Sequence, residues 1–467
     1  MGREEQIVSE RLKKLEELKK KGVNPYPHKF DKKDSVAKSL KLKLRTKVKT
    51  AGRIITKRDI GKIIFSDLQD SSGKIQLVFQ EGETDKKEFD FFRKYADTGD
   101  FFGVEGTIIK TKTGQVSILV SNIELLSKSI LPLPSKWYGL QDKEERYRKR
   151  YLDLIMNPEV REVFKKREKI IDTIRSFLKK KEYLEVETPL LQPLYGGAEA
   201  RPFTTNLNAL NLKMYMSISP ELYLKRLIAG DFEGVFTICK NFRNEGIDRT
   251  HNPEFTMMEL YVSYMDYNDM MKITESLLSE IAKNLHGKTE IEYQGKKINF
   301  KTPFKRIKMF DAIKKYAKID PKKLKIEEID QVFDEKVQPN LLQPTFIIDY
   351  PKELCPLTKE HRKDKNFVER FELFINGSEI ANAYSELNDP MEQEKRLIKQ
   401  IETRKKAKDF DAHFETSVLD KDFVESLSYG MPPLGGVGIG VDRITMLFTN
   451  QSSIRDVILF PFMKPEK

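Results

Sequence analysis

The chain has 467 residues, a mass of 54.5 kDa and a formal net charge of +12, with 84 Lys and Arg against 72 Asp and Glu. No apolar run approaches the roughly 18 residues of a membrane-spanning helix. Two cysteines, Cys239 and Cys355, are too few for a disulfide framework or a cysteine-rich zinc site. The first residues lack the apolar core of a secretory signal. We therefore expect a basic protein of the cytoplasm with about two to four domains.

Most of the positive charge lies near the N-terminus. Residues 1–50 hold 16 Lys and Arg against 7 Asp and Glu, a net of +9 out of the total of +12. The acids and bases of residues 13–21 have helical spacing. Such a segment suits a polyanion, because each phosphate contact releases counterions; the alternative is a solvated helix face that binds nothing. We predict a basic helical arm over residues 1–45.

Residues 46–128 contain short runs rich in Val, Ile and Phe, separated by turn residues. The runs are 48–55, 62–70, 74–80, 101–109 and 115–126. Five strands in about 80 residues are typical of a small barrel such as the OB-fold. Such barrels often stack single-stranded bases on exposed aromatic rings. Phe65 and Phe79 are candidates, although either ring could instead belong to the barrel core.

The rest of the chain predicts a second, larger domain. Pro132 and Pro134 indicate a linker over residues 129–150. An amphipathic helix follows over 159–181, where apolar residues recur at helical spacing. Beyond it, strand-like and helix-like segments mix without a regular βαβ alternation. We therefore predict an α+β domain over residues 151–467, built on a mostly antiparallel sheet.

Residues 238–264 form two strand-like runs around a polar loop. The two-residue period of a strand places Arg243 and Glu245 on one face of the first run. The same period places Phe255, Met257, Glu259 and Tyr261 on one face of the second. A face that alternates charged and aromatic groups suits a polar ligand with a planar ring. His251, in the loop, could touch a phosphate or simply be solvated.

A β-hairpin is predicted over residues 371–389, because Asn376-Gly377 is a strong two-residue turn signal. A regular hairpin pairs residue 374 with 379 and residue 372 with 381, so Glu372 and Glu379 lie diagonally on one face. Two such carboxylates could hold Mg²⁺ together with substrate phosphates. Without a cation or a basic neighbour they would repel each other. The alternative is a solvated strand face with two acids.

The same hairpin carries a second polar set, Asn382, Tyr384 and Glu386. Strict alternation places this set on the face opposite Glu379. If all these side chains line one pocket, a bulge must lie between residues 379 and 382. The hairpin therefore predicts a local irregularity that coordinates can test.

Residues 435–443 are rich in glycine but match neither a P-loop nor the G-x-G-x-x-G dinucleotide fingerprint. Gly436, Gly438 and Gly440 recur every second residue, so a strand here would leave one face bare for a flat ligand. Arg443 follows at the start of a predicted helix. The alternative is a glycine-rich turn with a surface arginine.

Together these segments resemble the three motifs of class II aminoacyl-tRNA synthetases, most closely those of the lysyl-tRNA synthetase family in subclass IIb. The resemblance spans nearly the whole chain and rests on residues 182–203, 219–227, 242–261, 371–390 and 432–465. It implies an OB-fold anticodon-binding domain over 46–128 and a catalytic domain over 151–467, with an antiparallel sheet flanked by helices. It also implies a homodimer whose interface includes the segment up to Pro189.

The resemblance further implies roles for individual residues. ATP contacts are implied for Arg243, Glu245, His251, Asn252, Phe255, Glu372, Glu379 and Arg443. Among these, Arg243 and Arg443 are the implied catalytic residues, and Glu372 and Glu379 the implied Mg²⁺ ligands. Lysine contacts are implied for Gly197, Glu221, Glu259, Tyr261, Asn382, Tyr384, Glu386 and Gly438. Anticodon contacts are implied for Phe65 and Gln76, and Tyr384 departs from some relatives, which carry phenylalanine there.

The implied activity is that of a lysine–tRNA ligase with L-lysine, ATP, Mg²⁺ and tRNA(Lys) as its partners. Lysine would first form lysyl-adenylate with release of pyrophosphate and would then pass to the 3′ end of the tRNA. Because the lysine carboxylate is already ionised, positioning and charge stabilisation would supply most of the catalysis. Glu221 and Glu386 are expected to hold the terminal ammonium of lysine.

Two alternatives remain at this point. A related enzyme for aspartate or asparagine is disfavoured by residues 196–203 and by the two acidic pocket residues. A paralogue that binds tRNA without catalysis is disfavoured because Arg243, Glu372, Glu379 and Arg443 are all present.

Overall fold

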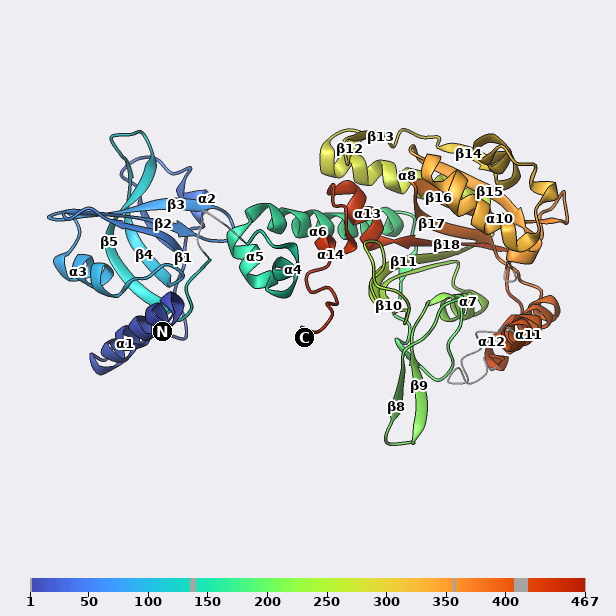
Figure 1. Ribbon diagram of the computed structural model, residues 1–467, viewed down its shortest axis with the longest axis horizontal. Helices are drawn as coiled ribbons and strands as arrows, with labels where there is room; N and C mark the ends of the chain where they lie inside the picture. Colours follow the sequence, from blue (N-terminus) through green and yellow to red (C-terminus); the bar gives the residue numbers. More distant parts are fainter. Residues whose placement is uncertain (1, 135–139, 356–357, 407–418, 467) are drawn as a thin grey trace. The chain divides into compact units, whose positions relative to one another are not determined.

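The computed structural model describes residues 2–134, 140–355, 358–406 and 419–466. The chain forms two compact units, Met1–Gln141 and Asp142–Lys467 (Figure 1). The division falls inside the predicted linker 129–150, of which residues 135–139 lie outside the described residues. None of the helices in the described ranges is both long and apolar enough to cross a bilayer.

The first unit contains a closed five-stranded barrel in the order β1-β2-β3-β5-β4. Its strands are β1 (Lys47–Asp59), β2 (Ile63–Gln69), β3 (Lys74–Gln80), β4 (Phe101–Lys110) and β5 (Val116–Ser127), and its helices are α1 (Arg3–Lys20), α2 (Val36–Ser39) and α3 (Lys86–Tyr95). Alternate residues of β2, such as Ile64 and Leu68, point into the core. The OB-fold prediction is confirmed, with β1 longer than the predicted run.

Of the two aromatic candidates in the barrel, only Phe65 points outward. Phe79 is fully buried, and its ring stacks on Phe92 of α3 with 4.1 Å between centroids. The suggestion that Phe79 stacks on nucleic acid is therefore wrong, because α3 covers this side of β3 and makes the ring part of the core. Phe65 alternates out of phase with buried Ile64 and is half-buried on the outer face.

The basic N-terminal segment is docked on the barrel through α1. Leu18 is fully buried in the barrel core. Arg11 is 5% exposed, and its guanidinium donates to the carbonyl of Leu131 at 2.8 Å and to that of Thr98 at 2.9 Å. Lys14 Nζ lies 2.7 Å from Asp97 Oδ1. Part of the N-terminal positive charge is therefore bound by the barrel's own acceptors.

Replacing Arg11 with methionine should release α1 from the barrel. The substitution leaves the carbonyls of Thr98 and Leu131 without their charged donor, a loss of about 1–3 kcal/mol. Hydrogen–deuterium exchange of the full chain should show faster exchange in α1 and unchanged protection in β1–β5. The exposed neighbour Lys13 provides the matched control, Lys13→Met. Unchanged protection of α1 in Arg11→Met would show that the guanidinium does not anchor the helix.

The second unit is built on an eight-stranded sheet in the order β14-β15-β16-β17-β18-β11-β10-β6. Its strands are β6 (Leu184–Glu185), β10 (Gly234–Phe242), β11 (Glu254–Ser263), β14 (Lys305–Lys308), β15 (Thr345–Pro351), β16 (Phe367–Ile375), β17 (Ser378–Ser385) and β18 (Leu434–Gly440). Only the pairs β14·β15 and β10·β6 are parallel. The predicted α+β class with a mostly antiparallel sheet is confirmed.

Smaller sheets and helices surround this sheet. The strands β7 (Leu191–Gln192), β8 (Thr204–Leu207) and β9 (Leu212–Met216) form a three-stranded sheet, and β12 (Glu290–Tyr293) pairs with β13 (Lys296–Asn299). The α-helices are α4 (Lys143–Arg148), α5 (Arg150–Met156), α6 (Pro158–Lys179), α7 (Glu221–Ala229), α8 (Tyr267–His286), α9 (Met309–Ala312), α10 (Ile326–Val332), α11 (Pro390–Lys406), α12 (Lys421–Ser428), α13 (Val441–Phe448) and α14 (Ile454–Val457). Short π and 3-10 turns are η1 (Ile313–Ala317), η2 (Pro321–Lys323), η3 (Phe333–Val337), η4 (Gln338–Asn340) and η5 (Lys352–Leu354). The β8–β9 hairpin projects away from the large sheet in Figure 1.

One face of the large sheet is apolar and is covered mainly by α6 and α8. The helix α8 is preceded by Asp266, whose carboxylate caps the amides of Asn268 and Asp269, and is followed by Gly287 in the left-handed conformation (φ 71°). Its buried residues pack with Ile174 of α6 on alternate residues of the strands, such as Phe371. Because strand side chains alternate, the residues between them point to the opposite face, which remains open for the functional groups.

A bulge in β17 brings the two polar sets of the hairpin to this open face. Phe374 pairs with Glu379 as predicted, but Ile380 is then skipped, so Glu372 pairs with Asn382. The predicted pairing of 372 with 381 is therefore wrong, and the predicted irregularity between 379 and 382 is present. A second irregularity in β15 leaves Asp349 at φ 60° and places Tyr350 on the same face. The hydroxyl of Tyr350 donates to Glu372 Oε2 at 2.8 Å.

Candidate active site

Two cavities open on the polar face of the large sheet. The larger has a volume of about 460 Å³ and the smaller about 400 Å³. Arg370, Glu372 and Glu379 line both cavities, so the two spaces meet at these side chains. A ligand that fills both would place its reacting groups beside these two carboxylates and this guanidinium.

The smaller cavity gathers seven of the eight residues predicted to contact the amino acid. They are Gly197, Glu221, Glu259, Tyr261, Asn382, Tyr384 and Gly438, and Arg243 lines the same cavity. The eighth, Glu386, does not line it but lies fully buried behind it. The bulge in β17 explains this convergence, because without it Asn382 and Tyr384 would face the apolar core.

The glycines of β18 give their space to neighbouring side chains. Gly438 pairs with Glu259 on one side and Asn382 on the other. A Cβ at Gly436 would lie 2.2 Å from Glu386 Oε1 and 2.5 Å from the ring of Tyr261. At Gly436 the bare strand face is therefore filled by the protein itself, and the expectation that a flat ligand approaches the backbone there is wrong. The absence of a side chain at Gly436 leaves the room that Glu386 and Tyr261 occupy.

Two glutamates of this pocket share one buried ammonium. Glu221 is the first residue of α7, and its Oε1 lies 2.5 Å from Lys225 Nζ. Glu386 Oε2 lies 2.6 Å from the same nitrogen. Sequence analysis did not single out Lys225, although the four-residue spacing from Glu221 on a helix was an available signal.

Glu259 is a third buried carboxylate, and together with Glu221 and Glu386 it forms what we call the acidic wall. Its Oε1 accepts a hydrogen bond from Ser219 Oγ at 3.0 Å, and its Oε2 accepts one from the hydroxyl of Tyr261 at 3.2 Å. Burial raises the pKa of Glu259 to about 8, with a further contribution from the charge of Glu221. Burial also raises the pKa of Glu386 to about 7, although Lys225 opposes the shift. The wall therefore favours any arrangement that adds a cation to the cavity.

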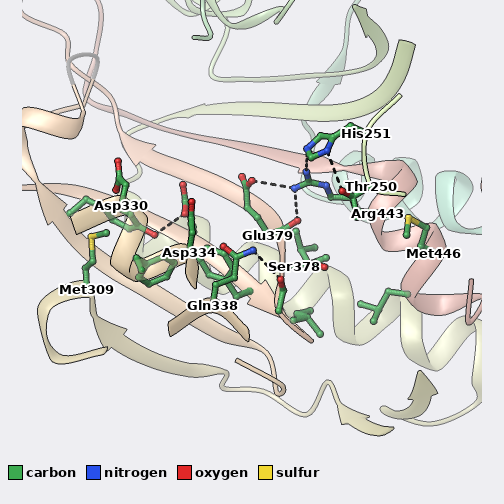
Figure 2. Close-up of a pocket in the computed structure, with 18 of the residues that line it drawn as sticks. Thr250, His251, Met309, Asp330, Asp334, Gln338, Ser378, Glu379, Arg443 and Met446 are labelled. Atoms are coloured by element: carbon green, nitrogen blue, oxygen red, sulfur yellow. Dashed lines mark hydrogen bonds and ion pairs between the residues drawn. The ribbon is translucent and has the colours of Figure 1, made fainter. Parts of the chain in front are cut away.

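The larger cavity places Arg443 between an acid and an imidazole (Figure 2). Arg443 Nη1 donates to the backbone carbonyl of Glu379 at 2.8 Å and to its Oε2 at 3.2 Å. Arg443 Nη2 lies 3.4 Å from His251 Nε2, and Asp248 Oδ2 lies 2.8 Å from the other ring nitrogen. The helix that carries Arg443 is held by Asp442, which accepts from the amide of Thr256 at 2.6 Å.

Three acidic side chains line the larger cavity. Asp330 of α10, Asp334 of η3 and Glu379 of β17 lie near one another in Figure 2. Burial raises the pKa of both aspartates, and for Asp334 the charges of Asp330 and Glu379 add to the shift. Among the described residues, no group of three or more His, Cys, Asp or Glu side chains is arranged to hold a metal ion on its own. Glu372 and Glu379 still fit Mg²⁺, because that ion binds through one or two carboxylates plus substrate phosphates.

Arg370 joins the two cavities and was not found by sequence analysis. Its guanidinium forms an ion pair with Glu372 and lies between two rings, 4.5 Å from the centroid of Tyr350 and 5.7 Å from that of Tyr384. Its Nη1 lies 3.0 Å from Cys355 Sγ. The position of Arg370 two residues before Glu372 on a strand was the available signal. Its contact with Tyr384 is made by the aromatic ring, which a phenylalanine would also supply.

Three residues predicted around adenosine do not line either cavity, although they neighbour residues that do. The strand β10 ends at Phe242, so Glu245 lies in an exposed loop, and the prediction that it shares a strand face with Arg243 is wrong. The guanidinium of Arg243 lies 5.1 Å from the centroid of Phe255. Asn252 is buried, and its side chain donates to the carbonyl of Glu254 at 2.6 Å. Glu245, Asn252 and Phe255 line neither cavity.

The barrel has a separate polar surface at Phe65 and Gln76. The pairing of β2 with β3 places both side chains on the outer face, where Gln76 lies opposite Asp67. The guanidinium of Arg58 lies 5.3 Å from the centroid of Phe65, and Gln76 Oε1 accepts from Ser117 Oγ at 2.9 Å. This surface combines an aromatic ring, a cation and an amide, as nucleic-acid-binding barrels do.

Comparison with known proteins agrees with this geometry. Residues 142–464 match the model of the family "tRNA synthetases class II (D, K and N)", and residues 48–126 match that of the OB-fold nucleic acid binding domain. The chain is 49% identical to a lysine–tRNA ligase of Carboxydothermus hydrogenoformans, with 98% of each chain covered. It is 49% identical to lysine–tRNA ligase 2 of Methanosarcina mazei, with 98% of this chain and 94% of the relative covered.

A third relative, a lysine–tRNA ligase of Pelotomaculum thermopropionicum, is 47% identical, with 100% of this chain and 97% of the relative covered. These matches extend over both structural units and include all the cavity residues described above. The chain therefore belongs to the class II tRNA synthetases and, within them, to the family of the lysine–tRNA ligases.

Proposed function

We propose that the chain is a lysine–tRNA ligase, which joins L-lysine to AMP with release of pyrophosphate and then transfers lysine to the 3′ end of tRNA(Lys). The observation that carries this proposal is the acidic wall of Glu221, Glu259 and buried Glu386 beside a second cavity that holds Arg443. The full-length similarity to lysine–tRNA ligases supports the same function.

The smaller cavity suits lysine because its end is acidic. Glu221 and Glu259 line it and would face the terminal ammonium, while Glu386 adds negative charge from behind. Tyr261, Asn382, Tyr384, Gly197 and Gly438 would shape the space around the aliphatic chain. A partly dry pocket of this kind disfavours amino acids that lack the cation, because they would bring no positive charge to its buried carboxylates.

The larger cavity suits ATP with Mg²⁺. Arg443 and His251 would contact the nucleotide, and Glu372 and Glu379 would hold Mg²⁺ against its phosphates. Bound Mg²⁺ would supply charge neutralisation at the phosphates. We further propose that Phe255, Asn252 and Glu245, which neighbour Arg243 on β11 and the preceding loop, contact the adenosine.

The chemistry needs little proton transfer in its first step. The lysine carboxylate is ionised and attacks the α-phosphate directly, so the protein mainly holds the two reactants in line. Arg243 lines the amino-acid cavity and would stabilise the charge that develops on the α-phosphate. Arg443 would hold the nucleotide in place from the other cavity.

The tRNA anticodon and a second copy of the chain would bind at the surface of the molecule. We propose that Phe65 and Gln76 contact the anticodon of the tRNA, with Phe65 stacking on a base. We also propose a homodimer, because Leu184, Leu190 and Leu191 are exposed around the segment that ends at Pro189. A cytoplasmic location is consistent with both cysteines being free thiols.

Amino-acid-dependent exchange of pyrophosphate into ATP tests the function directly. Lysine should support exchange, whereas aspartate and asparagine should not, because a pocket for a side-chain carboxylate would need cationic groups at its end. Chelation of Mg²⁺ should abolish the exchange, since Glu372 and Glu379 would then lack the ion that joins them to the phosphates. Exchange with aspartate, or tRNA binding without any exchange, would contradict the proposal.

Glu221→Gln should weaken the binding of lysine without weakening the binding of ATP. The variant keeps the size of the side chain but removes a charge that lines the cavity, so the lysine KM should rise by about 30-fold or more. The ATP KM should change little, because Glu221 does not line the larger cavity. Steady-state exchange kinetics at pH 7.5 measure both constants. An unchanged lysine KM would remove Glu221 from the binding site.

A further inference from the structure

The ammonium of Lys225 links Glu221, which lines the smaller cavity, to the carboxylate of Glu386, which does not. Lys225 is 1% exposed, and its Nζ lies 2.5 Å from Glu221 Oε1 on the same helix and 2.6 Å from Glu386 Oε2 beyond the end of β17. Glu221 lines the cavity, whereas Glu386 and Lys225 do not. The three groups therefore form a row that runs from the cavity into the core.

The ammonium in this row offsets the repulsion between the two buried carboxylates beside it. Two ionised carboxylates so close together in a buried volume would repel each other, and one of them would bind a proton instead. A shared ammonium removes that penalty only if its own burial is compensated by pairing. Pairing with both glutamates holds the pKa of Lys225 above its usual range despite its burial.

Several described titratable groups act on the row from neighbouring strands. Glu259 and Tyr261 face it from β11, Tyr384 faces it from β17, and Arg243 acts on Glu259 from the end of β10. The centroid of the Tyr261 ring lies 5.9 Å from Lys225 Nζ. Glu386 Oε1 has no hydrogen-bond partner within the described part of the chain. Among the residues that the structure describes, Lys225 is the cation that forms ion pairs with Glu221 and Glu386.

We propose that Lys225 is a positioning residue for amino-acid recognition, whose ammonium pairs with Glu221 and Glu386 at the same time and so holds the Glu221 carboxylate at the cavity wall. This inference rests on the proposed function, since it assumes that Glu221 receives the substrate ammonium. The substrate cation and Lys225 would then approach Glu221 from opposite sides. Lys225 does not touch the substrate, and it acts only through Glu221 and Glu386.

The test compares neutral and charged replacements of Lys225 in lysine-dependent pyrophosphate exchange. Lys225→Met removes the ammonium and its donors, Lys225→Gln removes the charge but keeps a donor, and Lys225→Arg keeps the charge. The matched control is Lys272→Met, because Lys272 is exposed on α8 far from the pocket residues. Lysine KM, ATP KM and the pH dependence of lysine KM are measured for each variant, together with the melting temperature.

In the neutral variants one buried carboxylate should bind a proton near neutral pH. The lysine KM at pH 7 should therefore rise by about 10-fold or more, with ATP KM within about threefold of the wild type. Lysine KM should fall as the pH rises, and the midpoint of this fall should lie about one pH unit or more higher in the neutral variants. Without the ammonium, a higher pH is needed to ionise the buried carboxylates. Lys225→Arg should restore most of the lysine affinity and the original pH dependence.

Three results distinguish the possible outcomes. An unchanged lysine KM and pH profile in a folded neutral variant would overturn the inference. A parallel rise of lysine and ATP KM without a pH shift would also overturn it, since that pattern indicates a general structural role. If Lys225→Met does not fold, Lys225→Gln decides by the same criteria. Absence of lysine-dependent exchange in the wild type would instead contradict the proposed function itself.

Discussion

The acidic pocket depends on one electrostatic constraint. Three carboxylates are buried together, and the ammonium of Lys225 pairs with two of them. Glu221, Glu259 and Glu386 are each at most 5% exposed. Burying an unpaired carboxylate is costly enough that the group binds a proton or gains a partner. A substrate with a cation at its far end would supply a further partner, so this charge imbalance supports the proposal that the pocket takes lysine.

The backbone is arranged to make this wall possible. The bulge at Ile380 turns Asn382 and Tyr384 toward the open face that already carries Glu372 and Glu379. The bare positions of β18 then leave room for Glu386 and Tyr261. Because the two cavities meet at Arg370, Glu372 and Glu379, the sites proposed for the amino acid and for the nucleotide would share this boundary. Reacting groups on the two substrates would therefore be brought together by one sheet face.

Local patterns predicted the parts of the fold that depend on neighbours in the sequence. The Asn376-Gly377 turn gave the correct pairing of residue 374 with 379, and the need to gather Asn382 with Glu379 revealed the bulge. Glu245 was misplaced because strand periodicity does not show where a strand ends. Phe79 was misjudged because α3 covers it, and Lys225 and Arg370 were missed because their importance arises from contacts between separate elements. Patterns along the chain thus located the site, whereas its charge balance required the folded structure.

Calorimetric titration with lysine and with norleucine, which has the same carbon chain without the terminal amine, tests the central claim most directly. The two ligands differ only in the terminal ammonium, the group that we propose the acidic wall recognises. Lysine should bind measurably and norleucine at least about a thousandfold more weakly, because norleucine would bring no cation to the three buried carboxylates. Affinities within about tenfold of each other would show that shape and apolar contact, rather than buried charge, select the amino acid.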